Sequence, residues 1–245
     1  MIPKKSYRSP EDILGFNEGL DRFLNGRLKL IQPKKGYRFS IDAVFLSQFA
    51  TIRPGDVVVD LGTGCGVIPL VLLLTKPVGH VFGLEVQEGL AVQAARNARL
   101  NGFEKRMDVI RGDIRHPPMA SGIANLVVCN PPYRKMKSGR INPDPQKAIA
   151  RHEILVSPDD LLRASATLLT QKGRFALVYP ALRLAEMLVR LRRFNLEPKR
   201  IRINYPDIES SAKLVLIEAT LGGRPGLEIL PPLLGQGDFS IADPP

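Results

Sequence analysis

The stretch Val57-Val-Val-Asp-Leu-Gly-Thr-Gly-Cys-Gly66 joins a β-branched apolar run to a turn rich in glycine, and an apolar segment then continues to about Leu74. Consecutive β-branched residues are typical of a strand buried on both faces, as in a parallel sheet. Glycine lets the backbone turn sharply and lets a ligand approach it closely. The stretch therefore predicts a strand, a turn able to admit a ligand, and a helix of an α/β domain.

The rest of the chain continues this alternation of strands and helices. Further strands are predicted at 80–84, 107–110, 124–129, 174–178, 198–203 and 212–219, and helices at 87–100, 158–169 and 182–194. Alternation of this kind implies a mostly parallel sheet with helices on both faces and right-handed crossovers. We expect a Rossmann-like, doubly wound α/β fold with a seven-stranded, mostly parallel sheet whose last strand is antiparallel. Ligands of such sheets bind beyond the carboxyl ends of the central strands.

Two flanking regions differ in pattern from residues 51–234, which hold the α/β domain. Residues 1–50 are predicted to form an N-terminal extension that covers the ligand site. It is expected to contain a helix around Pro10–Leu24, a short β segment at Arg27–Gln32 and a helix that begins near Ser40. Residues 235–245 are expected to form a loose C-terminal tail.

Composition narrows the class of protein. The chain has 245 residues, of which 44% are hydrophobic and 24% charged, as is typical of a soluble globular protein. The longest apolar run, Val67–Leu74, is too short to span a bilayer, and the N-terminus lacks the apolar core of a secretion signal. Cys65 and Cys129 do not have the spacing of metal ligands. We expect a cytoplasmic protein with reduced thiols, no membrane segment and no metal site.

The net charge of +11 favours a polyanionic partner, most often nucleic acid, although solubility alone is an alternative explanation. The positions of the basic residues support the first explanation, because they cluster in two predicted loops. These residues are Lys34, Lys35 and Arg38 in the first loop, and Arg134, Lys135, Lys137, Arg140, Lys147 and Arg151 in the second. We therefore expect both loops to contact phosphates.

The spacing of the glycines indicates which ligand the first turn binds. A dinucleotide fingerprint reads G-x-G-x-x-G/A, whereas the glycines here are Gly62, Gly64 and Gly66, and Val67 stands where the third small residue would be. Asp60 precedes the turn, and its carboxylate is a poor neighbour for a pyrophosphate but a good one for a cation. S-adenosylmethionine carries an ammonium and a sulfonium. The turn therefore favours S-adenosylmethionine over a nicotinamide dinucleotide, with a tight turn that binds nothing as the alternative.

Two more acidic residues follow predicted strands. Glu85 ends the second strand, where a carboxylate can accept hydrogen bonds from both ribose hydroxyls of an adenosine. This position fits S-adenosylmethionine and NAD equally. Asp113 follows the third strand and is suited either to accept from the adenine amino group of the cofactor or to cap a helix.

The motif Asn130-Pro-Pro-Tyr133 follows the fourth predicted strand. Asparagine and proline often only end strands and begin turns, which is one interpretation. The other is chemical: the Asn130 side-chain oxygen and the Pro131 carbonyl can accept the two N–H bonds of an exocyclic amine and stabilise the charge that develops as it is methylated. Proline stiffens these carbonyls, and the Tyr133 ring can stack on a planar group. The motif thus predicts transfer to a planar amino group.

Together, the glycine turn and Asn130-Pro-Pro-Tyr133 resemble the motifs of class I S-adenosylmethionine-dependent methyltransferases that act on amino groups. A narrower resemblance is carried by Ile31-Gln32, Gly36–Val44, Ala150–Glu153 and Lys172–Val178. These stretches are similar to the bacterial tRNA adenine-N6 methyltransferases, which modify the adenine beside the anticodon of valine tRNA. The resemblance implies that Asp42 and the turn from Tyr37 to Ser40 help to close the cofactor pocket.

Other substrates are compatible with the same motifs. A release-factor glutamine methyltransferase usually has a longer helical domain before the glycine turn, a DNA adenine enzyme needs a target-recognition insert, and rRNA guanine-N2 enzymes more often have Phe at the position of Tyr133. A non-catalytic RNA-binding protein of the same fold has no need of Asp60, Glu85 and Asn130 together. We expect methyl transfer from S-adenosylmethionine to N6 of an adenine in tRNA.

Overall fold

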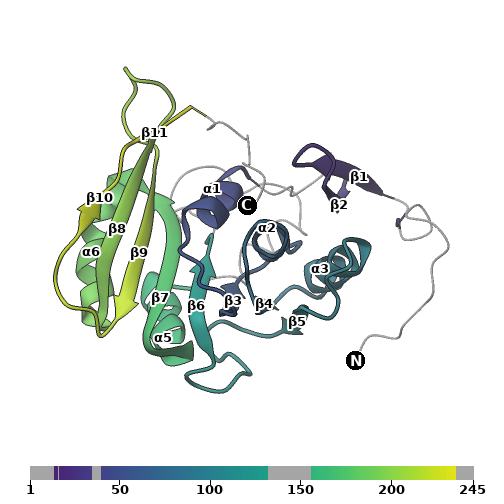
Figure 1. Ribbon diagram of the computed structural model, residues 1–245, viewed down its shortest axis with the longest axis horizontal. Helices are drawn as coiled ribbons and strands as arrows, with labels where there is room; N and C mark the ends of the chain where they lie inside the picture. The colour runs from purple at the N-terminus through teal and green to yellow at the C-terminus, as the bar shows by residue number, and fades with distance from the viewer. Residues whose placement is uncertain (1–13, 16, 35–39, 132–155, 236–245) are drawn as a thin grey trace, which may run out of the picture.

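The computed structural model describes residues 14–15, 17–34, 40–131 and 156–235 (Figure 1). Within these residues, one large sheet forms the centre of the molecule. Its strands are β3 (Val57–Leu61), β4 (His80–Glu85), β5 (Met107–Arg111), β6 (Ala124–Cys129), β7 (Leu169–Pro180), β8 (Leu196–Tyr205), β9 (Leu214–Leu221), β10 (Glu228–Ile229) and β11 (Leu233–Leu234).

The order of the strands creates a switch point in the middle of the sheet. The seven longer strands are ordered β5-β4-β3-β6-β7-β9-β8. Those from β5 to β7 pair in parallel, whereas β9 is antiparallel to both β7 and β8. From β3 the chain first moves outward to β4 and β5 and then returns to β6 on the other side, so the loops after β3 and β6 are neighbours. The predicted seven-stranded doubly wound sheet is confirmed, and the two-residue strands β10 and β11 extend it at β8.

Helices cover both faces of the sheet (Figure 1). One face carries α1 (Asp42–Phe49), α2 (Val67–Thr75) and α3 (Glu88–Leu100), and the other carries α5 (Pro158–Leu168) and α6 (Leu184–Arg193), which follows the short 3-10 helix η2 (Ala181–Arg183). A capping box starts α5: the Ser157 hydroxyl accepts from the Asp160 N–H, and the Asp160 carboxylate accepts from the Ser157 N–H.

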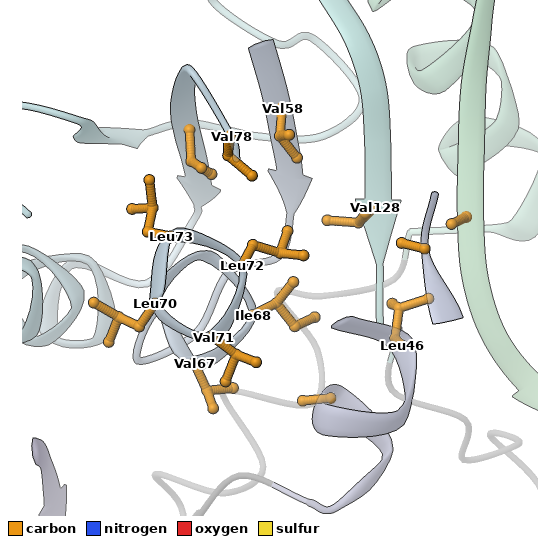
Figure 2. Close-up of a cluster of buried hydrophobic side chains, with 14 of the residues drawn as sticks. Leu46, Val58, Val67, Ile68, Leu70, Val71, Leu72, Leu73, Val78 and Val128 are labelled. Carbon is orange, nitrogen blue, oxygen red and sulfur yellow. The ribbon is translucent and has the colours of Figure 1, made fainter. Parts of the chain in front are cut away.

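The core between the sheet and α2 explains why this helix is apolar on all sides. Figure 2 shows Ile68 and Leu72 on the side of α2 that faces Val58 and Val128 of the sheet, and Leu70 on the opposite side. A helix surrounded by other elements has no polar face to present to water. This packing fixes the position of the glycine turn, because α2 begins directly after Gly66.

The N-terminal part forms a hairpin separate from the main sheet. Its strands β1 (Glu18–Phe23) and β2 (Leu28–Pro33) pair antiparallel. The helix predicted around Pro10–Leu24 is therefore wrong for the part that β1 occupies. The physical reason is the turn: Asn25 and Gly26 both have a positive φ, of 55° and 81°, and an Asn-Gly pair favours a hairpin.

The other predictions for the extension and the tail have mixed outcomes. The predicted β segment is β2, and the helix expected near Ser40 is α1, which begins at Asp42. Residues 1–13 and 236–245 lie outside the described residues, so the looseness of the tail stays a prediction. None of the helices in the described residues combines the length and the apolarity that crossing a bilayer requires.

Candidate active site

The glycine turn between β3 and α2 is held in one shape by backbone hydrogen bonds. Gly62, Gly64 and Gly66 have φ values of 77°, 57° and 86°, in the region that side chains other than glycine rarely adopt. The N–H groups of Gly62 and Thr63 both donate to the Leu84 carbonyl, at 2.9 and 3.0 Å. The turn is therefore anchored to the end of the neighbouring strand β4.

The glycines of this turn serve different purposes. A Cβ on Gly64 would meet no atom within 4 Å, so the backbone there is open to a ligand. A Cβ on Gly66 would lie 3.0 Å from the Met107 Cε and 3.2 Å from the Ala94 Cβ, so this glycine is needed for packing against α3 and β5. The turn thus has one side open and one side packed.

Asp60 lies in β3 just before the turn and is fully buried. Neither of its carboxylate oxygens has a hydrogen-bond partner among the described residues. Burial raises the pKa of Asp60 to about 7, and the nearby Glu85 carboxylate adds to the rise. An uncompensated buried carboxylate is costly. A cationic ligand at the turn would compensate for it, so this residue fits the sulfonium and ammonium of S-adenosylmethionine and not a pyrophosphate.

Glu85 ends β4 beside the turn and is 5% exposed. Its Oε2 accepts from the Gly64 N–H and its Oε1 from the Gln87 N–H, both at 2.9 Å. Each oxygen keeps a second lone pair for a further donor. The carboxylate is thus fixed in orientation and still able to accept ribose hydroxyls, the role that its position predicts.

Asp113 lies in the loop after β5, and this loop adjoins the turn, because the Ile114 Cδ1 would be 3.9 Å from a Cβ on Gly62. The Asp113 carboxylate accepts from the Arg115 backbone N–H at 2.8 Å and from the Arg115 guanidinium, which holds the pKa of this carboxyl below its ordinary value. Helix capping, the alternative role, is not what this carboxylate does here, since no helix follows it. The adenine contact stays a prediction.

Asn130 and Pro131 follow β6 at the switch point, and both are partly buried. The end of β6 is joined to the end of β3 because Val128 is paired with Asp60 and the Cys129 thiol donates to the Leu61 carbonyl at 3.0 Å. The first two residues of the Asn-Pro-Pro-Tyr motif therefore lie next to the glycine turn, as the topology predicts.

Several predicted site residues cannot be placed. Tyr133, Tyr37 and most of the basic loop residues lie outside the described residues; these basic residues are Lys35, Arg38, Arg134, Lys135, Lys137, Arg140, Lys147 and Arg151. Lys34 is described and exposed, and Asp42 is the first residue of α1 and half-buried. Their roles stay predictions.

Neither cysteine of the site is a plausible nucleophile. Both thiols are free and buried. Burial raises the pKa of Cys65 to about 11 and that of Cys129 well above its ordinary value. Both therefore remain protonated at neutral pH, which excludes thiolate attack by either cysteine.

Asn97 of α3 is a residue that the sequence analysis missed. It is fully buried, and its side chain bonds to the Cys65 carbonyl inside the glycine turn at 2.9 Å. The available signal was a polar residue at helical spacing from Ala94 and next to Ala98, small residues typical of a buried helix face.

Residues 41–191 match the methyltransferase small domain family. The chain belongs to this family. It is therefore an S-adenosylmethionine-dependent methyltransferase, as the two motifs predict. The match begins at α1 and ends within α6, so it contains the glycine turn, Glu85 and Asn130.

Curated relatives of this methyltransferase share a name. The tRNA1(Val) (adenine(37)-N6)-methyltransferase of Porphyromonas gingivalis is 32% identical over 186 residues, which cover 73% of this chain and 69% of the relative. The enzymes of the same name from Bacteroides thetaiotaomicron and Tolumonas auensis are 29% and 30% identical. These two matches cover 60% and 61% of this chain, and they span less than two thirds of the relatives, namely 61% and 62%.

Solved methyltransferase structures share the fold. A predicted O-methyltransferase from Agrobacterium tumefaciens superposes with a TM-score of 0.63 at 21% identity, covering 83% of this chain and 92% of that chain. The geranyl diphosphate C-methyltransferase of Streptomyces coelicolor, in complex with S-adenosyl-L-homocysteine, superposes with a TM-score of 0.56 at 16% identity, covering 73% and 79%. At these identities the likeness concerns the fold alone.

Proposed function

We propose that the protein transfers the methyl group of S-adenosylmethionine to the N6 amino group of an adenine in tRNA. The observation that carries the proposal is the position of Asn130 and Pro131 beside the glycine turn, at the switch point of a methyltransferase sheet. The names of the curated relatives support tRNA and N6 as the target. The net charge of +11 supports a polyanionic substrate.

The donor side of the site consists of Asp60, Glu85 and the three glycines. S-adenosylmethionine supplies an electrophilic methyl group held on a sulfonium. Gly64 leaves room for the donor at the backbone, and Glu85 is oriented to receive its ribose hydroxyls. Asp60 places a buried carboxylate, without a hydrogen-bond partner in the described part of the chain, just before the turn, and a cationic donor would hold it in its ionised form. These residues bind and orient the donor.

The acceptor side is the Asn-Pro-Pro-Tyr motif. The lone pair of an adenine amine is delocalised into the ring, so the amine is a weak nucleophile. The Asn130 amide oxygen and the Pro131 carbonyl accept hydrogen bonds from its two N–H groups. This favours a tetrahedral nitrogen with its lone pair localised and aimed at the methyl carbon, and it stabilises the positive charge that develops on nitrogen. A proton then leaves the methylated amine for water, so no general base is required before transfer.

A substrate-pool assay tests the proposal. The purified protein is incubated with methyl-labelled S-adenosylmethionine and separate pools of tRNA, rRNA, DNA and a release factor, and the products are identified by mass spectrometry. We expect N6-methyladenosine in tRNA alone. Label in release-factor glutamine, in rRNA guanine or in DNA adenine would replace this substrate assignment by the corresponding one.

A further inference from the structure

Helix α3 lies beside the hairpin (Figure 1). Two of its asparagines bond to the free edge of β2 as a neighbouring strand would. The Ile31 N–H donates to the Asn97 Oδ1 at 2.7 Å, and the Asn97 Nδ2 donates back to the Ile31 carbonyl at 3.2 Å. Asn101 makes the same pair of bonds with Lys29, at 2.9 and 2.7 Å.

The spacing of the two elements makes this pairing possible. Four residues of a helix rise about 6 Å, and two residues of a strand extend about 6.6–6.8 Å. Asn97 and Asn101 therefore meet alternate residues of β2, whose other edge is paired with β1. The hairpin is thus attached to the domain by backbone hydrogen bonds to side-chain amides, and also by an ion pair between Glu18 and Arg96 at 2.6 Å.

The two asparagines differ in the partner of the third hydrogen bond that each side-chain amide makes. The Asn97 Nδ2 also donates to the Cys65 carbonyl at 2.9 Å, between Gly64 and Gly66 of the glycine turn. The Asn101 Nδ2 instead donates to the Asn97 carbonyl of its own helix, at 2.8 Å. Of the two, only Asn97 joins the hairpin, α3 and the glycine turn.

The bond to Cys65 complements the one that Glu85 makes. Glu85 holds the turn through the Gly64 N–H, and Asn97 holds it one residue later through the Cys65 carbonyl. The same face of α3 presents Ala94 to Gly66. Because the Cys65 carbonyl is buried with its residue, loss of its partner would favour a rearrangement of the turn that restores a hydrogen bond.

We propose that Asn97 is a positioning residue for donor binding, which holds the Cys65 peptide in the shape that the donor requires and couples the turn to docking of the hairpin. This inference rests on the donor named in the proposed function and not on its tRNA substrate. Coupling is reciprocal, so a donor that favours the ordered turn must also favour the docked hairpin.

The wild-type protein provides the first test. Amide hydrogen exchange of the full chain is measured with and without saturating S-adenosylhomocysteine. We expect the nucleoside to slow exchange at the Ile31 N–H, which bonds to Asn97. Exchange at Ile31 that stays unchanged, while calorimetry shows S-adenosylhomocysteine to bind, overturns the coupling.

Variants of the two asparagines provide the second test, with Asn101 as the matched control. Asn97→Asp keeps an acceptor for the Ile31 N–H but cannot donate to the Cys65 or the Ile31 carbonyl, and Asn97→Ala removes the acceptor and the donor. We expect either change to raise the Kd for S-adenosylhomocysteine by roughly 5- to 30-fold. Asn101→Ala should speed exchange in the hairpin and, because it leaves the bond to the Cys65 carbonyl in place, raise this Kd much less than either Asn97 variant does.

The outcomes distinguish this inference from the proposed function. Asn97 variants with a wild-type Kd, or an Asn101→Ala protein that loses as much affinity as they do, overturn the role of Asn97. Failure of the wild-type protein to bind S-adenosylhomocysteine overturns the inference and the donor together. A protein that binds it through Asn97 but does not methylate tRNA overturns only the substrate assignment.

Discussion

At the scale of single residues, Asp60 links donor binding to stability. Its carboxylate is buried without a partner, and burial raises its pKa from the ordinary 3.8 to about 7. The folded protein therefore holds a proton that the unfolded chain releases between these two values. Stability from this group is fully present below pH 3.8, declines as the pH rises and is lost above about 7.

Replacing Asp60 by Asn should stabilise the donor-free protein at pH 8. The amide carries no charge to bury, so the free energy of unfolding of the variant does not fall between pH 5 and pH 8 as that of the wild type does. Each kcal/mol of this difference corresponds to about 2–4 °C in Tm. Thermal unfolding at both pH values measures the difference. Glu209→Gln, an exposed acid changed in the same way, is the control. A Tm difference between the variant and the wild type that does not grow with pH contradicts the argument. The same Asp60 variant should also bind S-adenosylhomocysteine more weakly.

The prediction for Asn130 differs from that for Asp60, because Asn130 belongs to the acceptor side of the site. Asn130→Ala should lower the rate of methyl transfer by about 10²–10³-fold, the typical cost of one donor or acceptor aimed at a developing charge. The Kd for S-adenosylhomocysteine should not change. Asn125→Ala is the control, because Asn125 lies near the other end of β6 and accepts the Val57 N–H at 2.9 Å. Unchanged turnover in the Asn130 variant would remove this residue from the reaction.

At the scale of elements, two glycines of the turn have different roles: Gly64 leaves space for the donor, and Gly66 allows close packing. Alanine at either position must adopt a left-handed backbone, which costs roughly 1–2 kcal/mol. At Gly66 the new Cβ would also press on Met107 and Ala94, whereas at Gly64 it would enter open space. We expect Gly66→Ala to lower the Tm more than Gly64→Ala, and Gly64→Ala to lose donor affinity out of proportion to its Tm. Equal Tm losses would contradict the distinction.

Elements were predictable from the sequence where the signal is local. The strand Ala124–Cys129 contains the apolar run Leu126–Cys129 just before Asn130, and the helix predicted at 158–169 is α5, which begins directly after the capping residue Ser157. The strand β1 was not predicted, although the Asn25-Gly26 turn that pairs it with β2 is a local signal. The attachment of the hairpin is remote, because β2 bonds to Asn97 and Asn101, more than sixty residues later in the chain. Side-chain amides that bond to the backbone in place of a strand do not produce a periodic pattern of apolar residues in the sequence.

At the scale of the whole molecule, the sequence was enough to place the site but not to complete it. Alternating strands and helices dictate crossovers, and these bring the ends of β3, β4 and β6 to one edge, where Asp60, Glu85 and Asn130 are found. The orphaned oxygens of Asp60 and the bond from Asn97 to Cys65 depend on three-dimensional packing. Spacing along the chain carries no information about which buried polar atoms find partners.

The net charge of +11 makes a prediction that belongs to the whole chain. Binding of tRNA releases counterions from its phosphates, so each phosphate contact should reduce affinity about threefold between 50 and 200 mM salt. S-adenosylhomocysteine has no phosphates, and its affinity in the same buffers is the control. We expect the Kd for tRNA, measured by filter binding, to rise several-fold while the Kd for S-adenosylhomocysteine stays nearly constant. If salt changes both Kd values by the same factor, the basic residues do not bind phosphates, and the net charge serves solubility alone.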